Sequence, residues 1–226
     1  MNPSALNIRN RLDLNGYAVA DVGDRENYLA ICNQLGKVTQ TREIFLKPRE
    51  QVEKYTGYSH LPDEVPFHTD HPLVNVVGLF CEEADNLGGG ENLLIDTRDI
   101  LEELSPLEVE VLKSVQIPLP RSEDRLPLLI IEESQPPHVY WLPAFAIANL
   151  DKLENSQAVA VRRFNQVISI RRREKRHLFF KLKSGQAIWF DNFVMLHGRD
   201  QLDPLSKRLQ VRAFIQYVRI PERERR

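Results

Sequence analysis

The residues best suited to chemistry are two histidines and one aspartate. His68 and Asp70 stand two residues apart in the sequence FHTD, residues 67–70. If this segment is extended, its side chains alternate between two faces, so the imidazole and the carboxylate project to the same side. The pair could then reach one metal ion, although such a pair by itself is common on protein surfaces. His71, the next residue, would point away from it.

The third candidate ligand is His197, which follows an apolar run and precedes Gly198 in a region rich in turn residues. Considered singly, it fits a hydrogen-bonded structural histidine better than a ligand. However, two histidines and one carboxylate on one face of a metal are the ligand set of non-haem iron(II) sites, in which the opposite face stays open. His68, Asp70 and His197 together therefore indicate a mononuclear iron site.

A third segment of interest, residues 207–216, alternates between apolar and polar side chains. As a strand it would place its apolar residues on one face and the remaining ones on the other: Arg208, Gln210, Arg212 and Gln216. Such a polar face usually meets water. Inside a barrel it could instead present fixed cations to a dicarboxylate, because the planar guanidinium of arginine can pair with a carboxylate in two ways.

The elements that must position these residues are partly visible in the first half of the chain. A strand is predicted at 16–21, and a helix at 24–35 that Asp24 caps and Gly36 ends. A second strand is predicted from residue 74 to 81, and the glycines at 88–90 are interpreted as a turn. A helix should begin near Asp96 or Thr97. Another should begin at Ser105, where Ser, Pro and Glu form a capping box; its predicted buried stripe is Leu107, Val111, Leu112 and Val115.

The second half reads as β-rich, with one further helix that carries Val161, Phe164, Val167 and Ile168 at helical spacing. Strands are predicted at 128–131, 139–142, 178–182, 187–190 and 209–218. Many short strands with few helices suggest a mainly β sandwich or barrel with flanking helices. Because no repeat or flexible linker divides the chain, we expect one domain over residues 1–226.

The overall composition indicates a folded protein but excludes few functions. The chain has 226 residues, of which 42% are hydrophobic and 27% charged, and a net charge of −2. These values are typical of a folded protein. The net charge is not positive, so it does not indicate binding to nucleic acid or to an anionic membrane. The basic residues at 171–176 are interpreted as a solvated surface. The two cysteines, Cys32 and Cys81, are interpreted as reduced core residues. No signal-like or membrane-spanning apolar stretch is found, so a cytoplasmic location is expected by default.

Several motifs together resemble the taurine dioxygenase and clavaminate synthase superfamily of iron(II)/2-oxoglutarate oxygenases. The resemblance rests on segments that are spread over nearly the whole chain: FHTD at 67–70, GGGENLLID at 88–96, WFDN at 189–192, LHGR at 196–199 and RLQVR at 208–212. It implies a double-stranded β-helix, the jelly roll of cupin-like proteins. Iron(II) would be its cofactor, and 2-oxoglutarate and O2 its co-substrates.

The resemblance also implies roles for individual residues. His68, Asp70 and His197 match the metal ligands, and Arg208 matches the arginine that binds the distal carboxylate of 2-oxoglutarate. Arg212 matches a second arginine that serves either co-substrate or substrate. Asn92 stands where many relatives have a threonine that contacts 2-oxoglutarate. Because Asp70 keeps its carboxylate, hydroxylation or a related oxidation such as desaturation is implied rather than halogenation, with release of succinate and CO2.

The substrate is the least defined part of the prediction. The loop at 55–66 precedes the first ligands and mixes aromatic with polar residues, so Tyr55, Tyr58 and His60 are candidate substrate contacts. The length of the chain favours a small molecule, such as an amino acid or a biosynthetic intermediate, over nucleic acid. An oxygenase that acts on a macromolecule and a non-catalytic metal-binding β-barrel are the alternatives. The sequence predicts no oligomeric state.

Overall fold

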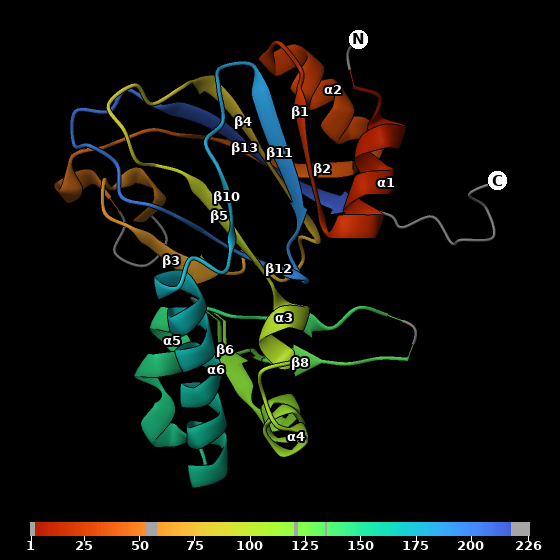
Figure 1. The fold of residues 1–226 in the computed structure, drawn as a ribbon, viewed down its shortest axis with the longest axis vertical. Helices are drawn as coiled ribbons and strands as arrows, with labels where there is room; N and C mark the ends of the chain where they lie inside the picture. Colours follow the sequence, from red (N-terminus) through yellow and green to blue (C-terminus); the bar gives the residue numbers. More distant parts are fainter. Residues whose placement is uncertain (1–2, 53–57, 120–121, 134, 218–226) are drawn as a thin grey trace.

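The computed structural model describes residues 3–52, 58–119, 122–133 and 135–217 (Figure 1). Two antiparallel sheets form its body. The first has the order β1-β11-β4-β13-β2, with β1 (Tyr17–Asp21), β11 (Gln186–Asp191), β4 (Val76–Glu83), β13 (Leu209–Tyr217) and β2 (Gly36–Ile44). The second has the order β10-β5-β12-β3, with β10 (Leu178–Phe180), β5 (Asn92–Asp96), β12 (Met195–Arg199) and β3 (Val65–His68).

The inner faces of the two sheets pack against each other, because strand residues alternate between opposite sides. Val77 and Ile188 of the first sheet share one buried cluster with Leu94 and Met195 of the second. This pairing of sheets confirms the predicted jelly roll.

Two N-terminal helices cover the outer face of the first sheet (Figure 1). They are α1 (Ala5–Asn15) and α2 (Arg25–Leu35), and they share a buried cluster with strand residues such as Val76 and Trp189. As predicted, Asp24 caps α2, and its side chain accepts a hydrogen bond from the backbone N–H of Asn27. Helix α1 was not predicted from the sequence.

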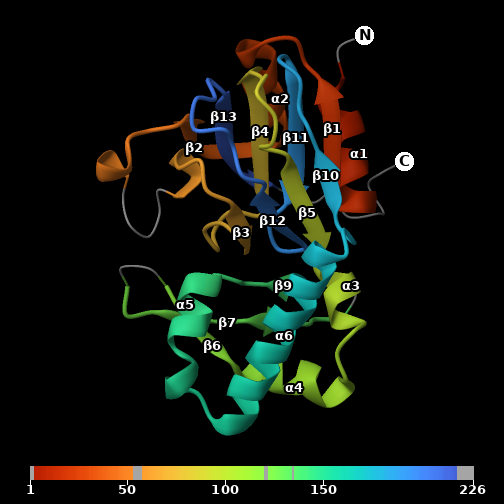
Figure 2. The same ribbon diagram turned by 60° about the vertical axis from the view of Figure 1, so that its left-hand side comes forward.

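The chain between β5 and β10 forms a second layer of helices and short strands against the outer face of the second sheet (Figure 2). Its apolar cluster includes Leu93 and Leu196 from that sheet. The layer contains α3 (Thr97–Leu101), α4 (Pro106–Ser114), β6 (Gln116–Pro118), β7 (Arg125–Pro127), β8 (Leu129–Ile130), β9 (His138–Val139), α5 (Pro143–Ala148) and α6 (Asn155–Arg173). Single 3-10 turns lie at Arg49–Gln51, Tyr58–His60 and Leu150–Lys152.

Helix α4 begins with the predicted capping box between Ser105 and Glu108. One residue of its predicted stripe is wrong, because Leu107 is 74% exposed whereas Leu112 and Val115 are buried. Leu107 is five residues before Leu112, which places it about 140° away around the helix axis. In α6, Val161, Phe164, Val167 and Ile168 are all buried, as predicted.

Several predicted strand bounds require correction. The strand predicted at 139–142 is only the two-residue β9, and the one at 128–131 is reduced to β8. Strands β2 and β12 were not predicted.

Both cysteines are free and buried, as expected. Among the described residues, no helix is long and apolar enough to span a membrane.

Candidate active site

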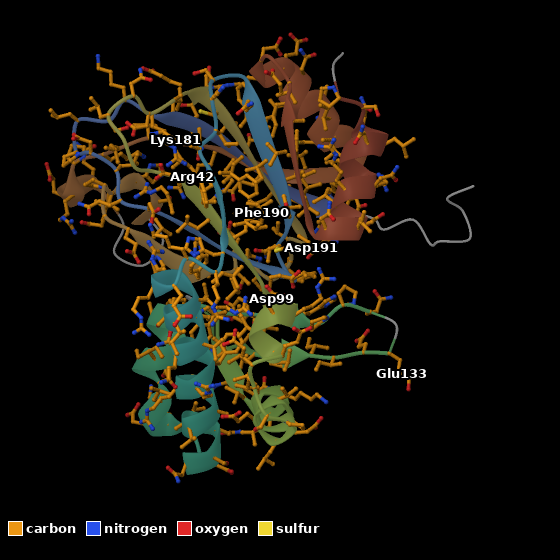
Figure 3. The ribbon with its side chains drawn as sticks, in the orientation of Figure 1. Arg42, Asp99, Glu133, Lys181, Phe190 and Asp191 are labelled. Atoms are coloured by element: carbon orange, nitrogen blue, oxygen red, sulfur yellow. The ribbon has the colours of Figure 1, made fainter. Side chains whose placement is uncertain are left out.

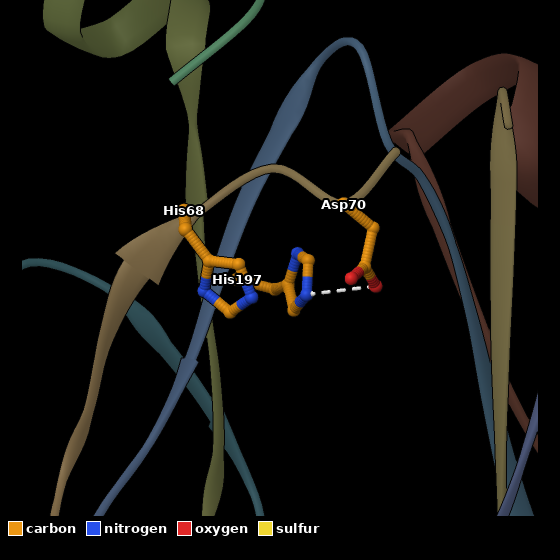
Figure 4. A group of neighbouring side chains, drawn as sticks. All are labelled: His68, Asp70 and His197. Carbon is orange, nitrogen blue, oxygen red and sulfur yellow. Dashed lines mark ion pairs between the residues drawn. The ribbon is translucent and has the colours of Figure 1, made fainter. Parts of the chain in front are cut away.

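Two strands of the second sheet bring the histidines together (Figure 4). His68 is the last residue of β3, and His197 lies in β12 directly opposite it in the antiparallel register. The centroids of the two rings are 4.1 Å apart. His197 Nε2 lies 3.3 Å from Asp70 Oδ2, and one donor atom from each of the three residues lies within 4.8 Å of the others. Three side chains from two separate motifs therefore form one group that could hold a metal ion.

Asp70 reaches this group by a different route from the one predicted. Strand β3 ends at His68, so the alternation does not continue through Asp70. Instead, the backbone N–H of Asp70 donates to Asn192 Oδ1 over 2.7 Å, and Asn192 Nδ2 donates to the carbonyl oxygen of Val74 over 2.8 Å. The condition for His71 to point away, a strand that continues past Asp70, is not met. His71 is exposed at the cavity, and its Nδ1 accepts a hydrogen bond from the backbone N–H of Leu73 over 3.2 Å.

Hydrogen bonding also determines which nitrogen of His68 can bind a metal. Its Nδ1 lies 2.9 Å from the carbonyl oxygen of Pro66. Because a carbonyl can only accept, Nδ1 carries the hydrogen, and the lone pair is on Nε2. A metal-binding histidine commonly donates the hydrogen of its other ring nitrogen to a carbonyl or carboxylate oxygen of the protein in this way.

The electrostatics of the group favour the forms that bind a cation. Burial, followed by the nearby His197, lowers the pKa of His68 to about 3, so His68 is neutral at neutral pH. Burial acts to raise the pKa of Asp70, but the Arg212 guanidinium and both histidines outweigh it and hold that pKa below its usual range. A neutral imidazole and an ionised carboxylate are the protonation states that metal binding requires. The donor set therefore fits a divalent ion such as iron(II).

Arg208 forms a second polar centre, deep in the same cavity. Its side chain donates to the carbonyl oxygen of Gly90 over 2.8 Å, to Asn92 Oδ1 over 3.1 Å and to Gln210 Oε1. It is 7% exposed and forms no ion pair within the described part of the chain. Burial lowers the pKa of Arg208 to about 10, so it stays protonated. A buried cation with only neutral partners is well suited to bind an anion.

Arg212 contacts the metal-ligand group directly. Its Nη1 donates to Asp70 Oδ1 over 3.2 Å, and its guanidinium lies 4.5 Å from the centroid of the Phe214 ring. As predicted, Arg208, which directly precedes β13, and Gln210 and Arg212 within β13 lie on one side, and all three line the cavity.

The cavity has a volume of about 1110 Å³ and lies between the sheets and the segment 119–145, of which residues 120, 121 and 134 are not described. Three of its polar lining residues were assigned no role by the sequence analysis: Gln40, Arg42 and Arg199. Arg199 donates to the carbonyl oxygens of Ser59 and Leu61 over 3.1 and 2.6 Å, and so holds the chain that leads to β3. Gln40 and Arg42 were missed because β2 was not predicted. The alternation in TQTREI, residues 39–44, was the available signal.

Of the three predicted substrate contacts, the structure describes the side chain of His60 alone. Tyr55 lies outside the described residues, and of Tyr58 only the backbone, in a 3-10 turn, is described. His60 is buried with its Nδ1 2.8 Å from the carbonyl oxygen of Phe45, and it is not among the described lining residues.

The basic segment 171–176 is compensated by acidic side chains rather than simply solvated. Arg171 is buried and pairs with Asp99 and Glu103 at 3.0 and 2.7 Å. Arg172 pairs with Asp200 at 2.7 Å, and Arg176 also pairs with Glu103. The interpretation of this run as a solvated surface is therefore wrong for Arg171. The pairs of Arg171 and Arg176 lie within the helical layer, where Asp99 is labelled in Figure 3, whereas the pair between Arg172 and Asp200 joins this layer to the rest of the fold.

A jelly roll with two histidines and one aspartate at one end, and a buried arginine beside them, defines the class of metal-dependent oxygenases. Comparison with family models gives the particular family. Residues 5–214 match the model described as "Taurine catabolism dioxygenase TauD, TfdA family", and the chain belongs to this family. The match confirms the predicted class of iron(II)/2-oxoglutarate-dependent dioxygenases. No curated protein matches the chain.

Solved structures support the fold at low sequence identity. An asparagine oxygenase, crystallised with Fe(II), 3-hydroxyasparagine and succinate, is 18% identical with a TM-score of 0.72, covering 93% of this chain and 77% of its own. The non-haem iron oxygenase OrfP, in complex with Fe and alpha-ketoglutaric acid, is 15% identical with a TM-score of 0.68, covering 93% and 79%. PvcB, an Fe, alpha-ketoglutarate-dependent oxygenase from an isonitrile synthetic pathway, is 18% identical with a TM-score of 0.64, covering 94% and 80%.

Proposed function

We propose that this dioxygenase oxidises a C–H bond of a small organic molecule, in a reaction that consumes 2-oxoglutarate and O2 and releases succinate and CO2. When bound, iron(II) and 2-oxoglutarate supply the oxidising chemistry. In hydroxylation, one oxygen atom of O2 enters the product and the other enters succinate. The observation that carries the proposal is a buried arginine, Arg208, which forms no ion pair among the described residues and lines the same cavity as three side chains that could bind one metal ion.

Each of these side chains has a proposed task. His68, Asp70 and His197 hold iron(II), with His68 binding through Nε2 because Nδ1 donates to Pro66. Arg208 binds the distal carboxylate of 2-oxoglutarate. The neutral acceptors around Arg208, one of which is Asn92, orient its guanidinium without cancelling its charge.

The proposed substrate is a small molecule such as an amino acid or a biosynthetic intermediate. Two of the structural neighbours, the asparagine oxygenase and OrfP, were crystallised with hydroxylated amino acids. The compensation of the basic segment 171–176 by acidic side chains also favours a small substrate over nucleic acid.

We also propose that residues 1–226 work as one domain. The segment between β5 and β10 shares its apolar cluster with Leu93 and Leu196 of the second sheet, and it supplies one wall of the cavity. Removing this segment would expose both the cluster and the cavity.

The proposal is tested by anaerobic addition of iron(II) and then 2-oxoglutarate to the metal-free protein. We expect the weak visible charge-transfer band of a chelated iron–oxoacid complex. The band should disappear in His68→Ala and Asp70→Ala protein and persist in His177→Ala protein, since His177 does not line the cavity. Iron binding by the folded protein without any band would overturn the proposal and favour a non-catalytic metal-binding barrel.

A further inference from the structure

Two arginines face each other across neighbouring strands on one wall of the cavity. Strands β2 and β13 are antiparallel, and Arg42 is directly opposite Arg212 in their register. Gln40, Arg42 and Ile44 all line the cavity, as the two-residue period of a strand requires. Like charges placed directly opposite each other on a sheet destabilise it. The pair of Arg42 and Arg212 therefore destabilises the sheet, so its presence is not explained by a contribution to stability.

The two arginines differ in what compensates them. Arg212 donates to Asp70 over 3.2 Å. Arg42 has no acidic partner within the described part of the chain. Its neighbour Glu43 alternates to the other face of β2, where it pairs with Arg25 at 2.7 Å. Because Arg42 is exposed and lines the cavity, its guanidinium can meet an anion bound there.

The charge of the whole cavity points the same way. The described lining contains four arginines but only two acidic residues, Asp70 and Asp124. Iron(II) and doubly charged 2-oxoglutarate would cancel each other, so an excess of two positive charges remains with both bound. The chain as a whole carries a net charge of −2. Positive charge concentrated in the cleft of an acidic protein draws anions to that cleft.

The wall contributed by the segment 119–145 is mainly apolar instead. It includes Leu119, Leu126, Ile130, Leu142 and Phe145. The cavity volume, about 1110 Å³, lies at the upper end of the range of roughly 300–1,000 Å³ that is typical of small-molecule sites. There is consequently room for an apolar body beside 2-oxoglutarate.

We propose that the substrate is an amphipathic anion, whose negative group binds Arg42 and whose apolar part lies along the wall at 119–145. This inference rests on the proposed function and deepens it by naming the substrate class. Arg42 is the specificity-determining residue, and Arg212 beside it strengthens the local positive potential.

The test measures binding of simple probes by calorimetry, under anaerobic conditions, to protein loaded with iron(II) and saturated with 2-oxoglutarate. Saturation keeps the probes away from Arg208. The probes are octanoate, octan-1-ol and octylamine, which share a chain and differ in head group, and acetate, which lacks the chain. The variants are Arg42→Gln and Arg42→Lys, with Arg162→Gln as the matched control, because Arg162 is exposed on α6 and does not line the cavity.

We expect wild-type protein to bind octanoate about five- to tenfold more tightly than octan-1-ol, the range for a partly exposed charged contact. Octylamine and acetate should bind more weakly than octanoate. Arg42→Gln should abolish the preference for octanoate without changing the affinity for octan-1-ol, Arg42→Lys should retain part of it, and Arg162→Gln should retain all of it.

Equal affinities for octanoate and octan-1-ol in wild-type protein, or an unchanged preference in Arg42→Gln, would overturn the inference. If acetate binds as tightly as octanoate, the apolar part of the proposal is wrong. All these outcomes are read while the charge-transfer band shows 2-oxoglutarate in place. Failure of the substrate class is thereby distinguished from failure of the proposed function, in which the band itself would be missing.

Discussion

Replacing Arg208 with glutamine should remove 2-oxoglutarate binding while leaving the fold nearly as stable as before. The effect on binding and the effect on stability should separate because Arg208 is buried and has no acidic partner among the described residues. A residue kept for stability alone would show the reverse pattern, in which the free energy of unfolding falls and co-substrate affinity follows only indirectly.

The magnitudes follow from the contacts of Arg208. Burial lowers its pKa from 12.5 to about 10, which corresponds to about 3 kcal/mol against the charged form at about 1.4 kcal/mol per pKa unit. Its hydrogen bonds to Gly90, Asn92 and Gln210 contribute about 1 kcal/mol each. These terms nearly offset each other. We therefore expect the free energy of unfolding of the metal-free protein to change by less than about 2 kcal/mol.

Binding of 2-oxoglutarate should change much more. Loss of one partner of a buried, hydrogen-bonded charge pair costs about 2–5 kcal/mol, a reduction in affinity of at least about 30-fold. At a concentration 100 times its dissociation constant, 2-oxoglutarate should stabilise the metal-loaded wild-type protein by about 2.7 kcal/mol, but the variant by less than about 1 kcal/mol.

The assay is urea denaturation with and without 2-oxoglutarate, under anaerobic conditions with iron(II), and with Arg162→Gln as the control. Two results would refute the reasoning. One is 2-oxoglutarate-dependent stabilisation of Arg208→Gln equal to that of wild type, and the other is loss of several kcal/mol of stability in the metal-free variant.

Three further predictions concern neighbouring features. Gly90→Ala should weaken 2-oxoglutarate binding, measured from the charge-transfer band, because Gly90 has φ +71° and an added Cβ would lie 3.1 Å from Arg208 Nη1; unchanged binding would contradict this. Ser105→Ala should lower the free energy of unfolding by about 1 kcal/mol, because the capping box of α4 with Glu108 is lost. Urea denaturation measures this change, and an unchanged free energy of unfolding would mean that the cap does not contribute. Because the pKa of His68 is about 3 when folded and 6.5 otherwise, the unfolded chain binds more protons between these pH values. Metal-free protein should therefore lose about 2 kcal/mol of stability from this histidine between pH 7 and pH 5; His68→Asn should lack this part of the pH dependence, and identical profiles would refute it.

The features that could be predicted from the sequence depend on residues close together in the chain. Asp24 and Ser105 begin α2 and α4 because a capping side chain acts within its own helical turn. The alternation in β13 predicted that Arg208 and Arg212 would share a face, since the strand period is a property of the backbone. For the same reason, the ligand types and the family motifs could be read from short segments.

Features that depend on long-range pairing could not be read in this way. The register of β3 and β12 puts His68 opposite His197, and Asn192, far along the chain, holds Asp70 in place after the strand has ended. Arg42 entered the cavity wall only because β2 pairs with β13. The sequence by itself determined which reactive side chains the protein contains and the local helices and strands in which they lie. Only the tertiary structure decided which groups meet, because register and layer packing depend on burial summed over residues that are distant in the chain.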